Sequence, residues 1–400
     1  MLFLFPYQSV ENFIEESMEK GNLKLSGTEV KFFFLKDGSG NWLQFWYSIV
    51  PEKPEQIIQQ ITSIEQAESE LFKIFKLGNE TAVTKRFFSS DLITHKNELL
   101  NYKKRQNTDF FMSTTEQPPA SGVKSALLGM CLNNIKANSK SRDGNIFYFD
   151  TTSGIRHIFA EHIIDSDADE HSDSEKQTEK IFGYLREKLS GFGASIEESV
   201  LRTWIYTPNV DADYPGIVKA RKNLFDSINL TKDTHYIAST GIQGGSGSRF
   251  SRVFMDAHAV LGVDKKDIRY IQAPEYLSPT HIYGVTFERA TAVELGKIDF
   301  LFISGTASID KEGNVVHPDD VEKQTQRTLQ NISVLLDSSG FKKGDLSSFI
   351  IYLRDAADLN FVKPQIDQYT ENLPTIYVKA PVCRPGWLIE IEATAARIIM

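Results

Sequence analysis

An internal repeat constrains the fold of this chain more than any other feature of its sequence. The tetrapeptide EKQT occurs at residues 175–178 and again at 322–325, and each occurrence opens a segment with the same order of expected elements. The period of about 145 residues is well above the roughly 20 to 50 residues of a solenoid repeat. We therefore expect a duplicated domain rather than a stack of short repeats.

Both copies alternate strands and helices in one order. In each copy the helix opened by EKQT leads to a strand that closes on tyrosine, at Tyr206 and at Tyr352. A second helix and further strands follow, and hairpin-like stretches at 146–160 and 282–304 precede the first helix. The resulting order, ββαβαββ, predicts an α+β fold with the helices on one face of a mixed sheet. The opposite face of each sheet must then be covered by another copy or another chain.

The region before the duplication reads as mixed α/β. Apolar runs at 30–35 and 42–50 predict strands, and the pattern at 57–77 predicts a helix. A segment rich in proline, serine and glycine at 114–122 marks a boundary. The expected domains are an N-terminal mixed α/β region (1–118), a degenerate repeat (119–275) and a catalytic repeat (276–400).

The composition is that of a globular protein from a reducing compartment. Hydrophobic residues make up 41% and charged residues 24% of the chain. The two cysteines, Cys131 and Cys383, are too far apart in sequence to build a disulfide framework. The segment 1–6 is apolar but lacks the basic start and the length of a signal peptide, and no window reaches the roughly 20 apolar residues of a membrane span. We expect a soluble, cytoplasmic protein.

The net charge of −9 argues against nucleic acid or an anionic membrane as partner, because binding to phosphates depends on lysine and arginine. One basic cluster, at 103–105, is too small to reverse this balance. A small anionic metabolite as substrate would require a local group of arginines.

The last strand carries two acids on one face. Side chains alternate along residues 387–395, so Glu390 and Glu392 point to one side while Ile389 and Ile391 point to the other. The two acids are then roughly 7 Å apart, and repulsion with partial burial would raise one pKa toward the range of a general acid. The same spacing also fits a solvent-facing strand with two ordinary glutamates.

An irregular segment between Pro381 and Pro385 precedes this strand. Within it, Arg384 is a candidate for bidentate binding of a substrate carboxylate, or else forms a surface ion pair. Cys383 has no matched histidine, so a small apolar wall is favoured over a nucleophile.

Two loops offer further candidates. Residues 304–308 follow an apolar strand, and small residues there, including Thr306 and Ala307, either let a ligand approach the backbone or form a plain tight turn. Upstream, Tyr283 and Arg289 are candidate ligand-binding residues. The alternative is that Tyr283 lies at the edge of the core and that Arg289 is an ordinary surface charge.

Two other segments are weaker candidates. The glycine-rich stretch 241–249 lacks the Gly-Lys-Ser/Thr ending of a P-loop and is better interpreted as a flexible loop. His157, Glu161 and His162 do not have the spacing of a metal motif, so structural roles are expected for them. We expect neither a metal nor a cofactor.

The last repeat resembles the Rid (YjgF-like) family of reactive-intermediate deaminases over about 120 residues. The resemblance rests on 303–305, the glutamine-bearing helix, the strand ending at Tyr352 and the segment 389–393. It implies a chorismate-mutase-like α+β unit that usually forms trimers with small-molecule sites between subunits. Members that act on imines carry an arginine on the penultimate strand, where this chain has Pro-Thr-Ile at 374–376. This departure disfavours imine deamination.

A longer resemblance, over roughly residues 140 to 400, is to the chorismatases (chorismate hydrolases). It rests on segments that occur in order along both repeats: 202–206, 239–241, 304–308, 382–385 and Glu390. The family has a duplicated Rid-like fold and removes pyruvate from chorismate to give a hydroxybenzoate or a dihydroxycyclohexadiene carboxylate. Its catalytic acid is the glutamate that matches Glu390.

This resemblance implies roles for the candidate residues. Chorismate is a dicarboxylate with an enol ether, so its hydrolysis requires a proton donor and cations for two carboxylates, without a metal. Glu390 is expected to be the acid. The residues expected to bind substrate are Arg289, Arg384 and Arg202 as clamps, Tyr283 as a hydrogen-bond donor, and Cys383, Thr306 and Ala307 as the pocket wall.

The upstream copy has Phe254 where the last copy has Glu390, so we expect it to act as a permanent partner domain. The protein is then a monomer with internal pseudo-symmetry or a homotrimer. Two alternatives stay open: a divergent Rid-type enamine or imine deaminase, and a non-enzymatic protein that binds a small metabolite.

Overall fold

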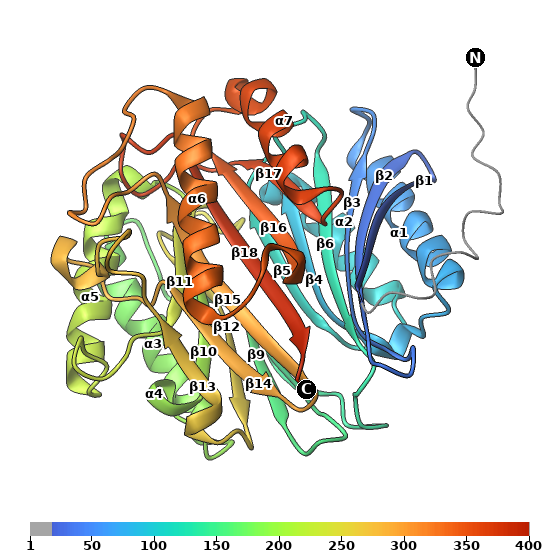
Figure 1. Ribbon diagram of the computed structural model, residues 1–400, viewed down its shortest axis with the longest axis horizontal. Helices are drawn as coiled ribbons and strands as arrows, with labels where there is room; N and C mark the ends of the chain where they lie inside the picture. The colour runs from blue at the N-terminus through green and yellow to red at the C-terminus, as the bar shows by residue number, and fades with distance from the viewer. Residues whose placement is uncertain (1–17, 400) are drawn as a thin grey trace.

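The computed structural model describes residues 18–399 and contains three six-stranded sheets, each built from one consecutive stretch of chain (Figure 1). The first unit runs in blue and cyan, the second in green and yellow, and the third in orange and red. In each unit one long helix follows the third strand and another follows the fourth, and the second unit has a short additional helix before its fourth strand. This arrangement confirms the expected α+β class with mixed sheets.

The elements of the first unit are β1 (Met18–Leu25), β2 (Thr28–Lys36), β3 (Trp42–Pro51), α1 (Ile57–Ile74), β4 (Ala82–Ser89), α2 (Leu92–Arg105), β5 (Phe111–Glu116) and β6 (Ser125–Leu132). Those of the second are β7 (Ser141–Asp143), β8 (Ile146–Asp150), β9 (Arg156–Ile164), α3 (Ser174–Ser190), α4 (Ile196–Ser199), β10 (Val200–Thr207), α5 (Val210–Ser227), β11 (Ala238–Gln243) and β12 (Phe254–Leu261).

The third unit consists of β13 (Ile268–Ile271), β14 (Ala290–Leu295), β15 (Ile298–Ala307), α6 (Val321–Ser339), β16 (Leu346–Leu353), α7 (Leu359–Thr370), β17 (Thr375–Lys379) and β18 (Ile389–Ile398). Short 3₁₀ turns connect several of these elements.

All three sheets have one topology. The strand orders are β1-β2-β3-β6-β4-β5, β7-β8-β9-β12-β10-β11 (read from the other edge) and β13-β14-β15-β18-β16-β17. Each unit thus contains the expected ββαβαββ order with one extra edge strand in front. The sequence repeat reveals two of these units, and the region expected to be a separate N-terminal α/β part has the same topology as both.

The pairing register confirms the equivalence of the units. In each, the strand after the first long helix has its bulge at the same place, before Thr84, Arg202 and Ser348. Such irregularities re-aim side chains and are specific features of a sheet. Strands β4, β10 and β16 can therefore be compared residue by residue.

The first sheet extends to Leu132, because residues 117–124 connect β5 to β6 within it. The boundary expected at 118/119 therefore lies inside the first unit. We propose unit boundaries near 133 and 267, in the connections between consecutive sheets.

Local sequence explains where the long helices begin and end. Helix α6 begins after Asp320, whose side chain accepts a hydrogen bond from the backbone nitrogen of Lys323 at 2.9 Å, and it ends at Gly340 with φ +76°. Asp91 and Asp173 cap α2 and α3 in the same way. Side-chain caps of this kind satisfy backbone donors of the first turn, and a glycine accepts the left-handed end without strain.

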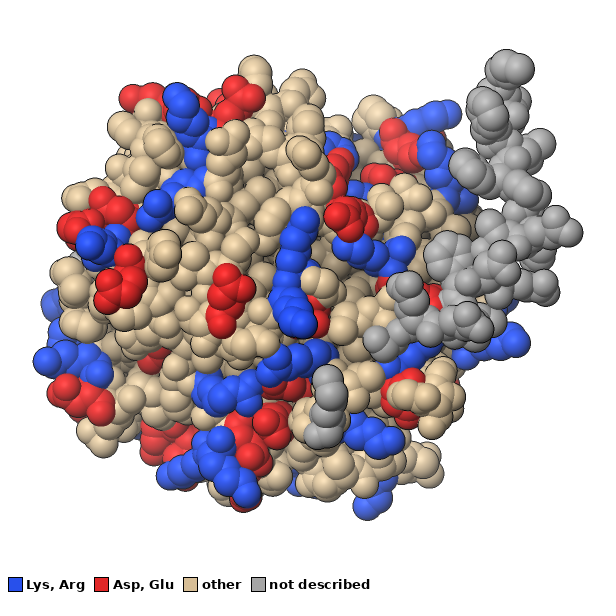
Figure 2. Space-filling view, in the orientation of Figure 1, with Lys and Arg blue, Asp and Glu red and all other residues tan. Residues whose placement is uncertain are grey.

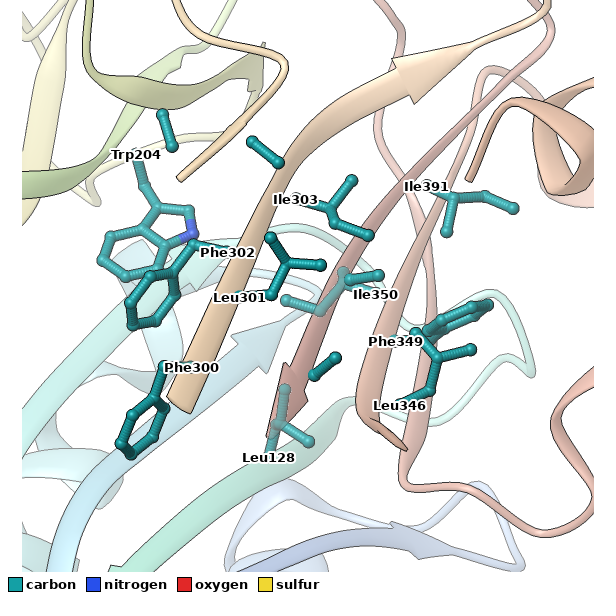
Figure 3. Close-up of a cluster of buried hydrophobic side chains, with 14 of the residues drawn as sticks. Leu128, Trp204, Phe300, Leu301, Phe302, Ile303, Leu346, Phe349, Ile350 and Ile391 are labelled. Carbon is teal, nitrogen blue, oxygen red and sulfur yellow. The ribbon is translucent and has the colours of Figure 1, made fainter. Parts of the chain in front are cut away.

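The helices lie outside and the bare sheet faces meet inside (Figure 1). Helices of the first and second units each pack in a core of their own, while one large core contains inner-face residues of all three sheets. Figure 3 shows part of this core, where Leu128 of β6, Trp204 of β10 and Phe302 of β15 come from three different units. The expectation that each bare face is covered by another copy is confirmed within one chain.

Charge on the visible face is mixed. Figure 2 shows lysine and arginine interspersed with aspartate and glutamate, with no broad basic area. Within residues 18–399 the structure has no helix that is both long and apolar enough to cross a membrane. The N-terminal segment 1–6, considered above as a signal sequence, lies outside the described residues.

Candidate active site

A cavity of about 510 Å³ lies between the second and third units; we call it the Glu390 cavity. Its walls come from α5 and β11 of the second unit and from β15, β18 and three connecting segments of the third. The residues that line it are Tyr214, Pro215, Val218, Lys219, Arg221, Lys222, Ser239, Gly241, Gly284, Val285, Phe287, Arg289, Gly305, Ala307, Ile309, Cys383, Arg384, Trp387 and Glu390. This combination of an apolar wall and a few charged groups is typical of a metabolite site.

Glu390 lies on β18, opposite Ala307 of β15 and Tyr352 of β16. Its carboxyl group rests on the backbone of Gly305, at the irregular part of the β15–β18 pairing. A Cβ atom on residue 305 would lie 2.0 Å from Oε1 of Glu390, closer than any non-bonded contact permits. Glycine at this position is therefore required for the observed placement of the acid.

Glu392, two residues along the same strand, is held by side chains from all three units. Its Oε1 accepts hydrogen bonds from Nη1 of Arg86 at 3.1 Å and from Nε1 of Trp204 at 2.6 Å. Its Oε2 lies 3.0 Å from Nη2 of Arg202 and accepts from Tyr352 at 2.9 Å and from Thr240 at 3.0 Å. We call Glu392 and these five partners the Glu392 cluster.

The two acids have opposite protonation behaviour. Burial, together with the neighbouring charge of Glu392, raises the pKa of Glu390 to about 8. Burial also disfavours ionisation of Glu392, but Arg202 and Arg86 and the hydrogen bonds of its cluster outweigh it and lower its pKa to about 2. A pair of carboxyl groups with pKa values pushed apart is how enzymes separate a proton donor from a fixed anion. At neutral pH Glu390 is protonated and Glu392 is charged.

Two of the arginines expected from the sequence line the cavity. Arg289 is buried, and its guanidinium donates to the carbonyl of Ser278 at 2.6 Å. Arg384 donates to the carbonyl of Gly313 at 2.8 Å and lies over the ring of Trp387 at 4.8 Å. These contacts hold both guanidinium groups beside the cavity.

A third arginine in the wall, Arg221 of α5, was not among the sequence candidates. It is 1% exposed, and its Nε and Nη1 donate to Thr286 at 3.1 Å and to Ser239 at 3.4 Å. Its Nη2 is buried and has no hydrogen-bond partner in the described structure. A buried guanidinium with an unused donor is costly unless something binds it, so this group points to an anionic ligand.

Three other expected residues have different positions. Arg202 lies behind the cavity wall in the Glu392 cluster, where its charge compensates Glu392. Thr306 is buried, and its hydroxyl donates to the carbonyl of Ser304 at 2.9 Å rather than lining the cavity. The side chain of Tyr283 lies outside the part of the chain that the structure describes.

Cys383 and Ala307 both line the cavity. Burial raises the pKa of the Cys383 thiol to about 12, the nearby Glu390 acts in the same direction, and a hydrogen bond with Tyr214 acts in the opposite one. Because only a thiolate is a strong nucleophile, this cysteine is inert at neutral pH. It serves as part of the wall.

Comparison with known proteins connects the third unit to a family. Residues 290–397 match the family model described as Endoribonuclease L-PSP. A RutC family protein of Saccharolobus solfataricus is 30% identical over 96 residues, which are 24% of this chain and 76% of that protein. A RutC family protein of Pyrococcus horikoshii is 31% identical over 99 residues, 24% of this chain and 79% of that protein.

A solved structure matches most of the chain. The crystal structure of a chorismatase superposes with a TM-score of 0.59 and 19% sequence identity, and the match covers 80% of this chain and 94% of that one. At this identity the match shows a shared fold. It extends across more than one unit, whereas the sequence relatives match about one.

Proposed function

Because the chain belongs to the RutC family through its third unit and shares the fold of a chorismatase, we propose that it hydrolyses chorismate to pyruvate and a ring acid, with Glu390 as general acid. The observation that carries this proposal is a protonated, buried glutamate in a cavity whose wall contains three arginines, Arg221, Arg289 and Arg384. No other acid lines this cavity among the described residues.

The proposed reaction begins with transfer of the Glu390 proton to the methylene carbon of the enolpyruvyl group. The ether carbon becomes an oxocarbenium ion, whose positive charge is stabilised by the new carboxylate of Glu390 and by the fixed anion Glu392 behind it. Addition of water and collapse of the hemiketal release pyruvate and a dihydroxycyclohexadiene carboxylate. If the neighbouring ring hydroxyl adds to this carbon in place of water, cleavage of its bond to the ring and loss of a ring proton release pyruvate, which keeps that oxygen, and a hydroxybenzoate.

The arginines would hold the two carboxylates of the substrate. Bidentate pairing between guanidinium and carboxylate fixes both charge and orientation. Hydrogen bonds to the carbonyls of Ser278 and Gly313 and to the hydroxyl of Thr286 hold Arg289, Arg384 and Arg221 in the wall. Proximity of the clamped enol ether to Glu390 then supplies the orientation that proton transfer requires.

The test is incubation of the purified protein with chorismate, with pyruvate and ring product measured separately. We expect pyruvate release with the wild type and at least about a hundredfold loss with Glu390→Gln, the usual size of a general-acid contribution. The exposed Glu312→Gln is the matched control and should retain full turnover. Absence of pyruvate with the wild type would refute the proposal, and release of ammonia from an imine substrate would support the deaminase alternative.

The pH profile gives an independent readout. A general acid must be protonated, so kcat/KM should be constant below the pKa of Glu390 and fall as the pH rises through about 8. The net charge of −9 and the mixed surface (Figure 2) do not fit ribonuclease activity, which the name of the matching family model suggests.

A further inference from the structure

A second cavity occupies the equivalent place between the first and second units. It has a volume of about 150 Å³ and we call it the His162 cavity. Helix α2 and strand β5 form one side, as α5 and β11 do in the Glu390 cavity, and β9 forms the other, as β15 does there. The residues lining it are Leu92, Lys96, Leu99, Leu100, Lys103, Met112, Thr114, Glu161, His162 and Ser246.

The pairing register shows which residues correspond. The β9–β12 ladder is interrupted between Ala160 and Ile163, and the β15–β18 ladder between Ile303 and Thr306. His162 therefore stands at the position of Gly305. Unlike Gly305, His162 has a positive φ, +52°, which is uncommon for a residue with a side chain.

This substitution removes the acid site and creates a different one. Phe254 stands at the position of Glu390, and the imidazole of His162 packs on its ring at a centroid distance of 5.0 Å. Both ring nitrogens of His162 are buried without a hydrogen-bond partner in the described structure. Backbone carbonyls of Thr114 and Ser246 lie near the ring but outside hydrogen-bonding geometry. Buried polar atoms are normally hydrogen-bonded. The unpaired ring nitrogens of His162 therefore point to a ligand that supplies the missing partner.

The charges around this cavity favour an anion. Glu161 is fully engaged: its Oε1 lies 2.7 Å from both Lys103 and Arg142, and its Oε2 accepts from the backbone nitrogen of Met112 at 2.9 Å. Lys96 has no ion pair with any described residue. The lining residues Lys96, Lys103 and Glu161 sum to one positive charge.

We propose that the His162 cavity is a second ligand site, which binds a small carboxylate. The ammonium group of Lys96 would bind the carboxylate, the imidazole of His162 would donate its N–H, and Leu99 and Met112 would contact the apolar end. Burial and the charge of Lys96 lower the pKa of His162 to about 4, so the ring is neutral at pH 7 and has one donor and one acceptor nitrogen. This site is distinct from the Glu390 cavity and does not depend on the function proposed for it.

The test is a titration of the full-length protein with sodium pyruvate, followed through the histidine ring signals in NMR. No histidine of the described residues lines the Glu390 cavity, so the signals of His162 report on the second site. They are assigned by their absence from His162→Gln or, should that variant not fold, by contact with the ring of Phe254. We expect saturable shifts that sodium chloride at the same ionic strength does not produce.

Charge variants on α2 supply the matched comparison. Lys96→Gln should weaken pyruvate binding about threefold to tenfold, because it removes the group that pairs with the carboxylate. Lys104→Gln removes the same charge from an exposed residue of the same helix that does not line the cavity, and it should leave binding unchanged. Absence of saturable shifts, or equal weakening by both variants, would overturn the proposal.

Discussion

Glu390 and Glu392 project from the same face of β18, two residues apart, yet the pKa of the first is raised to about 8 while that of the second is lowered to about 2. Glu390 faces a cavity over the bare backbone of Gly305, whereas Glu392 is surrounded by donors from three units. The two are linked in one direction: the fixed charge of Glu392 helps to keep the proton on Glu390.

The raised pKa of Glu390 predicts a pH-dependent stability. Its pKa is higher in the folded protein than the ordinary 4.5, so the folded state holds a proton that the unfolded state loses between pH 4.5 and about 8. Stability is therefore greatest below this window and decreases through it. The free energy of unfolding, measured in urea, should rise for Glu390→Gln relative to the wild type from pH 5 to pH 9. The expected relative gain is on the order of 3 kcal/mol. A constant difference across this range would contradict the raised pKa.

Replacement of Glu392 should destabilise the whole molecule. Glu392→Gln leaves Arg86 and Arg202 buried without their shared counter-charge, a loss that typically costs roughly 3–5 kcal/mol. The free energy of unfolding in urea at pH 7 measures this. Glu312→Gln, at an exposed site, should change it by less than about 0.5 kcal/mol, and an equally small effect of Glu392→Gln would show that the cluster is not a stabilising junction.

Gly305→Ala should reduce turnover more than stability. The new Cβ would occupy the place of the Glu390 carboxyl oxygen, and displacement of a reacting group by about 1 Å can cost about a hundredfold in rate. Turnover of chorismate and thermal unfolding are measured side by side. Gly183→Ala, on α3 with open space around it, is the control and should retain activity. Full activity of Gly305→Ala would mean that Glu390 need not rest on this backbone.

Arg221→Gln should weaken substrate binding. Loss of a charge-assisted hydrogen bond typically costs about 1.5–3 kcal/mol, so we expect KM for chorismate to rise about tenfold to a hundredfold with a smaller change in kcat. Arg249→Gln removes an arginine that is exposed and outside the cavity and should leave KM unchanged. If both variants change KM equally, Arg221 acts only through long-range electrostatic attraction and makes no direct hydrogen bond to the substrate.

The protein should be a monomer in solution. Three units of one topology already cover one another's bare faces within a single chain, so no sheet face of these described units requires a second copy. Light scattering after gel filtration should give the mass of one chain, 45.2 kDa. A mass three times larger would show that the described units still assemble with copies of themselves.

The sequence predicted the second and third units but not the likeness of the first to them. The two later units share residues at the start of a helix and at Tyr206 and Tyr352, whereas the first has Phe88 at the equivalent strand position. On β6 the equivalents of Glu390 and Glu392 are Ala126 and Leu128. What the first unit shares is strand order and the position of a bulge, and neither leaves a readable trace in residue identity.

The candidate site was predicted in part. One cavity is lined by most of the predicted residues: Glu390, Arg289, Arg384, Cys383 and Ala307. Arg202 instead belongs to the Glu392 cluster. The sequence could not show this, because only three-dimensional packing reveals which anion Arg202 approaches. Arg221 could have been found: it lies four residues after Ile217 and four before Phe225, on the buried stripe of its helix. A charged residue in such a stripe indicates either a buried ion pair or a ligand.

The covalent linkage of three similar units has a consequence for how this protein can change. In a ring of three identical subunits, one mutation appears at every interface, so a substitution that improves one cavity between subunits alters the other two as well. Here each interface between units is encoded separately. Gly305 with Glu390 can be kept at one interface while His162 with Phe254 occupies the next, and each can diverge without harm to its neighbour.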